Sequence, residues 1–113
     1  MKRNMFAQEN VADGTEVVIA TLPGIQGKTR KVTGVNTEVK DELFLRVWLN
    51  QLKVFEQNTA HLLNVYGSAS LYRAEVDLDI ELVQGSELKV SLYNNSGGAV
   101  NPAQVSINYD EPM

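Results

Sequence analysis

The clearest pattern in the chain is an alternation of apolar and polar residues over positions 72–94. Aliphatic residues alternate with carboxylates before a central glycine turn, and with mostly polar residues after it. Such period-2 alternation places one set of side chains on a buried face and the other in water. We predict a hairpin in which Leu82 faces Leu88 and Glu81 faces Lys89, because opposite charges across two strands stabilise a register.

Shorter segments rich in β-branched or alternating residues predict further strands. They cover residues 15–21, 29–39, 42–50, 52–55 and 103–110. Val32 and Val35 have opposite parity, so we expect a bulge at Gly34 between them. The only predicted helical turn covers residues 57–65, with Asn58 or Thr59 as its cap.

The segment 42–55 predicts a second hairpin that turns at Asn50, a residue type that tolerates a positive φ angle. In that register Trp48 faces Lys53 and Arg46 faces Phe55. Val47 then faces Val54, and Leu49 faces Leu52, on the opposite side of the hairpin.

Seven or eight short strands with no long helix indicate an all-β fold, a two-sheet antiparallel β-sandwich. We prefer a jelly roll; an immunoglobulin-like Greek key is the alternative. Residues 1–14 are expected to form an N-terminal arm or edge strand, and residues 15–113 a single domain. The strand order stays open, because alternation identifies faces and not neighbours.

Composition narrows the function classes. The 113 residues carry a net charge of -4 and no cysteine, so thiolate metal sites are excluded. Residues 58–113 are the acidic part, which disfavours a broad nucleic-acid surface. No apolar run approaches ~20 residues, and the N-terminus lacks the apolar segment of a signal peptide. We therefore expect a soluble protein with no membrane span.

One predicted surface combines aromatic and basic residues, and we call it the aromatic–basic face. It consists of Phe44, Arg46, Trp48, Lys53 and Phe55. Trp and Arg are enriched in the energetically important centres of protein interfaces. The same face could instead be covered by the N-terminal arm or a loop, or a flat aromatic ring could stack on a sugar. These interpretations stay open.

Two charged groups and one histidine are further candidates. The acidic row Glu75, Asp77, Asp79, Glu81 supplies the oxygen ligands that calcium takes, but successive carboxylates on a strand lie ~7 Å apart, so a solvated strand face is favoured. The basic cluster Lys28, Arg30, Lys31 follows a glycine-containing loop whose spacing does not match a phosphate-binding loop. His61 is the only histidine, so it has no second His and no Cys to share a catalytic or metal site.

Three segments together resemble small single-jelly-roll structural proteins of viruses and phages. They are LFLRVWLNQLKVFEQ, DLDIELVQGSELKVSLYNNSGGA and the closing AQVSINYDEP. Members serve as minor capsid, vertex or decoration subunits, so the resemblance implies a virion location and partners that are further copies or viral shell proteins. Bacterial sandwich-type binding modules show similar patterns.

The sequence therefore predicts a non-enzymatic structural or assembly protein that acts through protein–protein contacts, without a cofactor or metal. The alternative is a carbohydrate-binding or adhesive β-sandwich, which depends on Trp48 beside Phe44 and Arg46. A jelly-roll metal enzyme requires several His ligands, and one histidine cannot supply them.

Overall fold

The computed structural model describes residues 1–62, 64–67 and 72–111. Within these residues the chain forms nine strands and one short 3-10 helix, η1. Their bounds are β1 (Lys2–Val11), β2 (Glu16–Pro23), β3 (Arg30–Glu38), β4 (Leu43–Leu49), β5 (Leu52–Asn58), η1 (Thr59–His61), β6 (Asn64–Gly67), β7 (Tyr72–Leu82), β8 (Glu87–Asn94) and β9 (Val100–Asp110). No helix among the described residues is long and apolar enough to cross a membrane.

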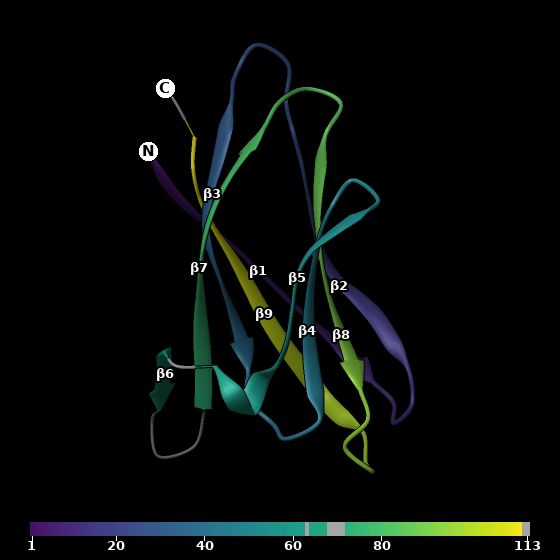
Figure 1. The fold of residues 1–113 in the computed structure, drawn as a ribbon. Helices are drawn as coiled ribbons and strands as arrows, with labels where there is room; N and C mark the ends of the chain where they lie inside the picture. The colour runs from purple at the N-terminus through teal and green to yellow at the C-terminus, as the bar shows by residue number, and fades with distance from the viewer. Residues whose placement is uncertain (63, 68–71, 112–113) are drawn as a thin grey trace.

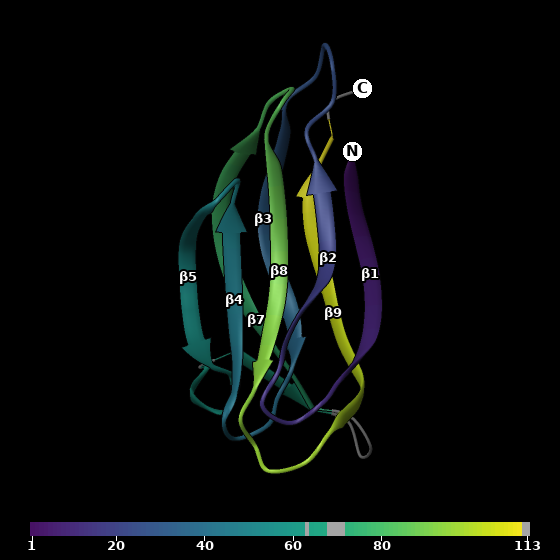
Figure 2. The ribbon, with the colours of Figure 1, turned by 90° about the vertical axis from the view of Figure 1, so that its right-hand side faces the viewer.

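The strands form two antiparallel sheets, with the orders β1-β9-β3-β7-β6 and β2-β8-β4-β5. Figure 1 shows the two layers, and Figure 2 shows β5, β4, β8 and β2 in front of the other sheet. Apart from the short β6, each sheet has four strands, and β1, β2, β3 and β4 alternate between the sheets. This order is that of the jelly roll, and it confirms the predicted all-β sandwich. An immunoglobulin-like fold would instead keep its first two strands in one sheet.

The predicted hairpin of residues 72–94 is wrong, because β7 and β8 lie in different sheets. Leu82 and Leu88 are both fully buried, as the alternation requires. Glu81 lies opposite Lys31 of β3 and not opposite Lys89. Two strands whose aliphatic sides match can pack face to face across a sandwich instead of edge to edge, and their sequence pattern is the same in both arrangements.

The corner between β7 and β8 packs tightly against the end of β2. The backbone N–H of Gly24 donates to the carbonyl oxygen of Ser86 over 2.8 Å. A Cβ atom added at Gly24 would lie 1.8 Å from the carbonyl oxygen of Val83. Real Cβ atoms do not approach backbone so closely, so this crossing of two backbones requires glycine.

Several local predictions are confirmed. The register shifts between Val32 and Gly34, where the bulge was expected. Asn50 has a φ of 57° at the β4–β5 turn. Asn58 caps η1, and its side-chain oxygen accepts from the backbone N–H of Ala60 over 3.1 Å. The segment expected as an arm or edge strand contains β1, which pairs with β9 at the end of its sheet.

The core lies between the sheets and consists of the aliphatic residues on their inner faces. Its largest fully buried members are Leu43, Leu45, Leu82, Leu88, Leu92, Ile107, Val11, Val32, Val35, Val47, Val90 and Val105. Each fully buried aliphatic side chain contributes about 1.5–3 kcal/mol relative to exposure. The opposite side of β2-β8-β4-β5 is therefore free to carry polar and aromatic residues.

Candidate contact surface

The side of β2-β8-β4-β5 that points away from the core gathers polar and aromatic residues from all four strands. We call it the outer face; its residues are Glu16, Phe44, Arg46, Trp48, Lys53, Glu56, Ser91 and Tyr93. They become neighbours because Arg46 lies opposite both Ser91 of β8 and Glu56 of β5. The sheet therefore builds the site from residues far apart in the chain.

Arg46 is the centre of the outer face. Its guanidinium donates to the carboxylates of Glu16 and Glu56, on the two edge strands of the sheet. Its Cζ atom also lies 4.9 Å from the centroid of the Tyr93 ring, in a cation–π contact. These partners fix the position of the guanidinium, because its donors have fixed directions.

The ionic network shifts the pKa values of two of its members, Arg46 and Glu56. Burial opposes the charged form of Arg46, but hydrogen bonds to Glu56 and Glu16 outweigh that effect, so its pKa is raised. A hydrogen bond from Lys53 and a second from Arg46 lower the pKa of Glu56. Lys53 Nζ lies 3.1 Å from Glu56 Oε1. Both shifts favour the charged forms, of Arg46 and of Glu56.

Trp48 joins the network through its ring nitrogen. Its Nε1 donates to Ser91 Oγ over 3.1 Å, and Ser91 Oγ donates in turn to Glu16 Oε2 over 2.7 Å. Ser91 is fully buried beneath these groups. The rings of Phe44 and Tyr93 lie 6.2 Å apart in a tilted arrangement. The indole is thus held in one orientation by a chain of hydrogen bonds.

A shallow pocket of about 340 Å³ lies beside Trp48, at the end of the outer face. Its lining residues are Glu16, Val18, Trp48, Asn50, Gln51 and Lys89. Val18 is half exposed within it. The pocket combines one aromatic ring, one apolar side chain and several polar groups, which suits a small polar ligand or a side chain of a partner.

Four of the five residues of the predicted aromatic–basic face lie on the outer face, and Phe55 does not. Trp48 faces Lys53 as predicted, but the register then shifts, so that Phe55 pairs with Val47 and packs against the core. The extra residue is Val54, which is 41% exposed. A bulge of one residue reverses the side on which every later side chain points, and Glu56 takes the place expected for Phe55 opposite Arg46.

The N-terminal segment does not cover this surface, because β1 belongs to the other sheet. The residues that sequence reasoning missed are Glu16, Glu56, Ser91 and Tyr93. The alternation of β8 did place Ser91 and Tyr93 on the side away from the core. No sequence signal indicates that β8 lies between β2 and β4, which is what brings these residues to Arg46.

The other charged candidates lie elsewhere, and three of them, Arg30, Lys31 and Asp79, form ion pairs. In the acidic row, Asp79 lies 3.3 Å from Lys31 Nζ. Arg30 contacts Glu111 at 3.3 Å, and its Cζ lies 5.3 Å from the Tyr109 ring centroid. His61 is exposed at the end of η1. Among the described residues, no three His, Cys, Asp or Glu side chains gather as metal ligands do.

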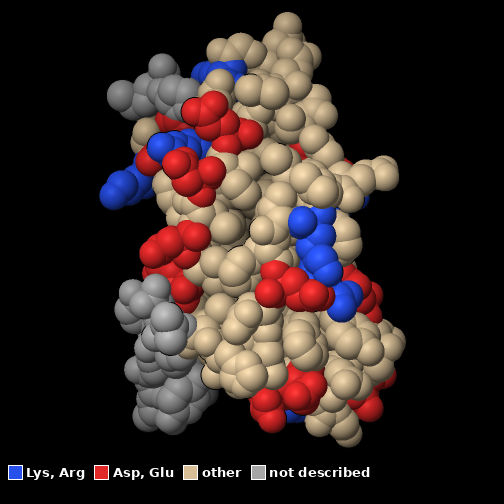
Figure 3. Space-filling model, viewed as in Figure 1, with Lys and Arg blue, Asp and Glu red and all other residues tan. Residues whose placement is uncertain are grey.

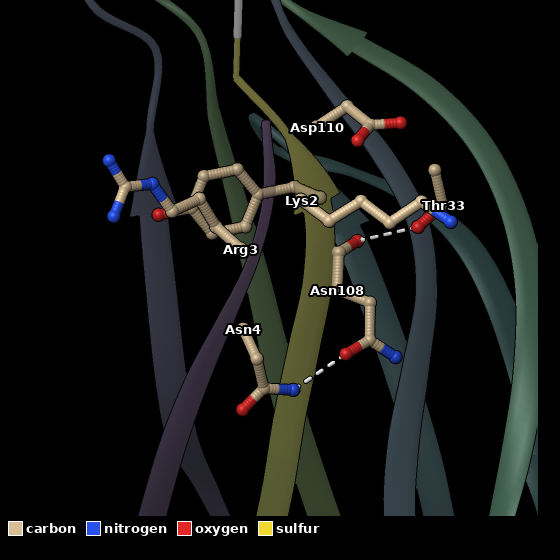
Figure 4. A pocket seen from close by; sticks show the side chains of 7 residues that line it. Lys2, Arg3, Asn4, Thr33, Asn108 and Asp110 are labelled. Carbon is tan, nitrogen blue, oxygen red and sulfur yellow. Dashed lines mark hydrogen bonds between the residues drawn. The ribbon is translucent and has the colours of Figure 1, made fainter.

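A second pocket, of about 490 Å³, lies on the outer side of the other sheet (Figure 4). Asn4 Nδ2 donates to Asn108 Oδ1 over 2.6 Å, and Asn108 Nδ2 donates to Asn36 Oδ1 over 2.7 Å. Thr33 Oγ1 donates to the Asn108 carbonyl oxygen over 3.2 Å. These side chains form hydrogen bonds with one another across β1, β9 and β3, so the polar groups named here already have partners within the chain.

The surface drawn in Figure 3 mixes charges of both signs. Blue Lys and Arg side chains lie beside red Asp and Glu side chains, and no basic patch gathers on the described part of this face. Binding to a nucleic-acid backbone depends on clustered positive charge.

Comparison with curated proteins found the queuine tRNA-ribosyltransferase accessory subunit 2 of Ixodes scapularis, which is 35% identical to this chain over 80 residues. The match covers 71% of this chain but 19% of the relative's length. This chain is therefore similar to about a fifth of that protein. No family model matches the chain. No solved structure matches it.

Proposed function

We propose that this chain is a non-catalytic structural subunit that assembles with other proteins through the outer face. The jelly-roll strand order and the resemblance to capsid, vertex and decoration proteins of viruses support a virion subunit. Its partners would be further copies of the chain or viral shell proteins. The relative's name describes an accessory subunit, which also favours a protein that acts in an assembly.

The observation that carries this proposal is the organisation of the outer face around Arg46. An unpaired charge is costly to bury in an interface, whereas here each cation already has a carboxylate partner. Trp, Tyr and Arg supply large contact areas and are the residues enriched at interface centres. The outer face is thus rigid, electrically balanced and partly aromatic, as a docking surface requires.

Fluorescence quenching of Trp48, the only tryptophan, tests the proposal directly. The chain is titrated from roughly 1 µM to 1 mM while light scattering follows its mass and acrylamide quenches the indole. We expect Trp48 to become shielded as assemblies form. Trp48→Ala should weaken assembly by tenfold or more, as hot-spot truncations do. Lys28→Ala, at an exposed loop position between β2 and β3, is the matched control.

Two results together would overturn the proposal. The first is Trp48 quenching that does not change over the whole concentration range. The second is an assembly state that is the same for the wild type, Trp48→Ala and Lys28→Ala.

A carbohydrate-binding module is the second candidate, and the pocket beside Trp48 supports it. Glu16 and Lys89 line this pocket together with the indole. A glycan array would give hits that disappear in Trp48→Ala and persist in Lys28→Ala. An array without hits, or one in which Trp48→Ala binds like the wild type, would contradict this candidate.

A further inference from the structure

The open edge of β1 is the longest regular edge in the fold. Among the strands that the structure describes, β1 pairs with β9 alone, and it ends the strand order of its sheet. Its ladder runs from Lys2 to Glu9 before the register shifts between Glu9 and Val11. Figure 2 shows β1 along the right-hand side of the molecule, with no strand drawn beyond it.

The hydrogen bonds at the end of this ladder show which backbone groups point outward. Met1 and Glu111 exchange both of their backbone hydrogen bonds, over 2.8 and 2.9 Å. Hydrogen-bonded pairs recur at every second residue of an antiparallel ladder. The backbone N–H and C=O groups of the odd-numbered residues of β1 therefore point toward β9. Those of Lys2, Asn4 and Gln8 point toward the open edge.

We propose that a second copy of this chain pairs with this edge, so that two β1 strands run antiparallel about a two-fold axis at Phe6. This inference deepens the proposed function, since it names the first partner of an assembly subunit. In this register Arg3 lies opposite Glu9 of the second copy, and Asn4 lies opposite Gln8 of the second copy. The symmetry doubles both pairs, as in every isologous interface.

Charge complementarity selects this register over its neighbours. Directly opposite residues in an antiparallel pair share one face of the sheet, so Arg3 and Glu9 meet on the same side. The Arg3 side chain is 50% exposed and its Nε lies 3.5 Å from Glu111 Oε2 of the same chain, so Arg3 would bridge Glu111 and Glu9 of the second copy, which is exposed. A shift by two residues in either direction would place Arg3 opposite Ala7 or Val11 and lose both ion pairs.

The edge carries charges at Lys2, Arg3 and Glu9, but it lacks two other common protections against pairing. Natural edge strands carry prolines, inward-pointing charges or central bulges that prevent association. β1 contains no proline, and its register shift lies near its end. Phe6, at the proposed axis, is 49% exposed. Pairing would bury part of this apolar surface. It would also join the five-stranded sheets of the two copies into one continuous sheet.

Charge reversal in the full chain tests the register. Sedimentation equilibrium should show a dimer for the wild type over roughly 1 µM to 1 mM. Arg3→Glu and Glu9→Arg each turn two attractive pairs into repulsive ones, so each should weaken the dimer by roughly tenfold or more. The double variant Arg3→Glu/Glu9→Arg restores opposite charges and should return the dimer to within a few-fold of wild type.

A proline substitution tests the backbone contact independently of charge. Gln8→Pro removes an N–H that points to the open edge and leaves the β1–β9 ladder intact. Gln8→Ala is its matched control, because both lose the side-chain contact with Gln104. We expect Gln8→Pro to be monomeric and Gln8→Ala dimeric, with urea unfolding used to verify that both are folded.

The inference is overturned by a wild type that stays monomeric over the whole range. It is equally overturned by single charge reversals that dimerise normally, or by Gln8→Pro that dimerises like Gln8→Ala. A dimer that depends on Trp48 and not on β1 would refute this edge contact and leave the outer-face proposal standing. A dimer that depends on β1 and is unaffected by Trp48→Ala would support the edge contact and count against the outer face as the assembly surface.

Discussion

Replacing Asn94 with alanine removes a buried amide that joins three segments of the chain. Asn94 is fully buried at the end of β8. Its Nδ2 donates to the carbonyl oxygens of Val11, over 3.0 Å, and Gly98, over 2.8 Å. Its Oδ1 accepts from the backbone N–H and the hydroxyl of Ser96, over 3.0 and 2.6 Å. The side chain therefore ties the end of β1 and the loop before β9 to β8.

The expected cost follows from the groups that the substitution leaves unpaired. Val11 is fully buried, so its carbonyl oxygen loses a partner where water does not reach. An orphaned buried polar group costs about 1–3 kcal/mol, and a lost hydrogen bond about 0.5–1.5 kcal/mol. Gly98 and Ser96 are partly exposed, so water compensates them in part. We expect Asn94→Ala to lower the free energy of unfolding by about 3–4 kcal/mol, a large fraction of a typical total of 5–15 kcal/mol.

Urea unfolding followed by the fluorescence of Trp48 measures this difference. Asn95→Ala is the matched control, because Asn95 is the exposed neighbour of the same residue type, and it should change stability by less than about 0.5 kcal/mol. The dependence on urea concentration should be the same for all three proteins. A loss below about 1 kcal/mol for Asn94→Ala, or an equal loss for Asn95→Ala, would refute the reasoning.

Two further predictions concern the β7–β8 corner and the outer face. Gly24→Ala should lower the free energy of unfolding by about 1–3 kcal/mol or more, because the new methyl group would meet the Val83 carbonyl oxygen. Gly98→Ala is the control, because a methyl group there meets no atom within 4 Å. Equal melting temperatures for the two variants would contradict this prediction. The pKa of Glu56 is lowered in the folded state, so its contribution to stability is complete above the ordinary glutamate pKa of roughly 4.3 and is lost as the pH falls through the lower folded value. The stability difference between wild type and Glu56→Gln should therefore shrink on acidification, and a difference that grows toward acid pH in urea titrations would oppose this assignment.

Sequence reasoning placed many side chains on the correct side of their strands. Leu43, Leu45 and Val47 of β4 are buried, and Arg46 and Trp48 point away from the core, as their alternation predicts. This succeeded because the side-chain period of a strand is two, so parity alone decides burial within a regular strand. Where the strand is irregular parity fails, and Phe55 was assigned to the wrong face.

The neighbours of each strand were decided by the tertiary structure. β7 and β8 have the pattern of a hairpin, yet the chain crosses between the sheets at the Val83–Ser86 turn. Alternation states which side of a strand is apolar, and both pairing and face-to-face packing satisfy it. The crossing decides the pairing, and with it the position of β8 between β2 and β4.

The candidate site divides in the same way. The sequence by itself determined that Phe44, Arg46, Trp48 and Lys53 share one surface, because all four lie on neighbouring strands joined by the Asn50 turn. Only the folded sandwich brought Glu16, Ser91 and Tyr93 to Arg46, through strands that are distant in the chain. Local periodicity encodes the direction in which a side chain points, whereas its partners depend on long-range pairing that no single segment specifies.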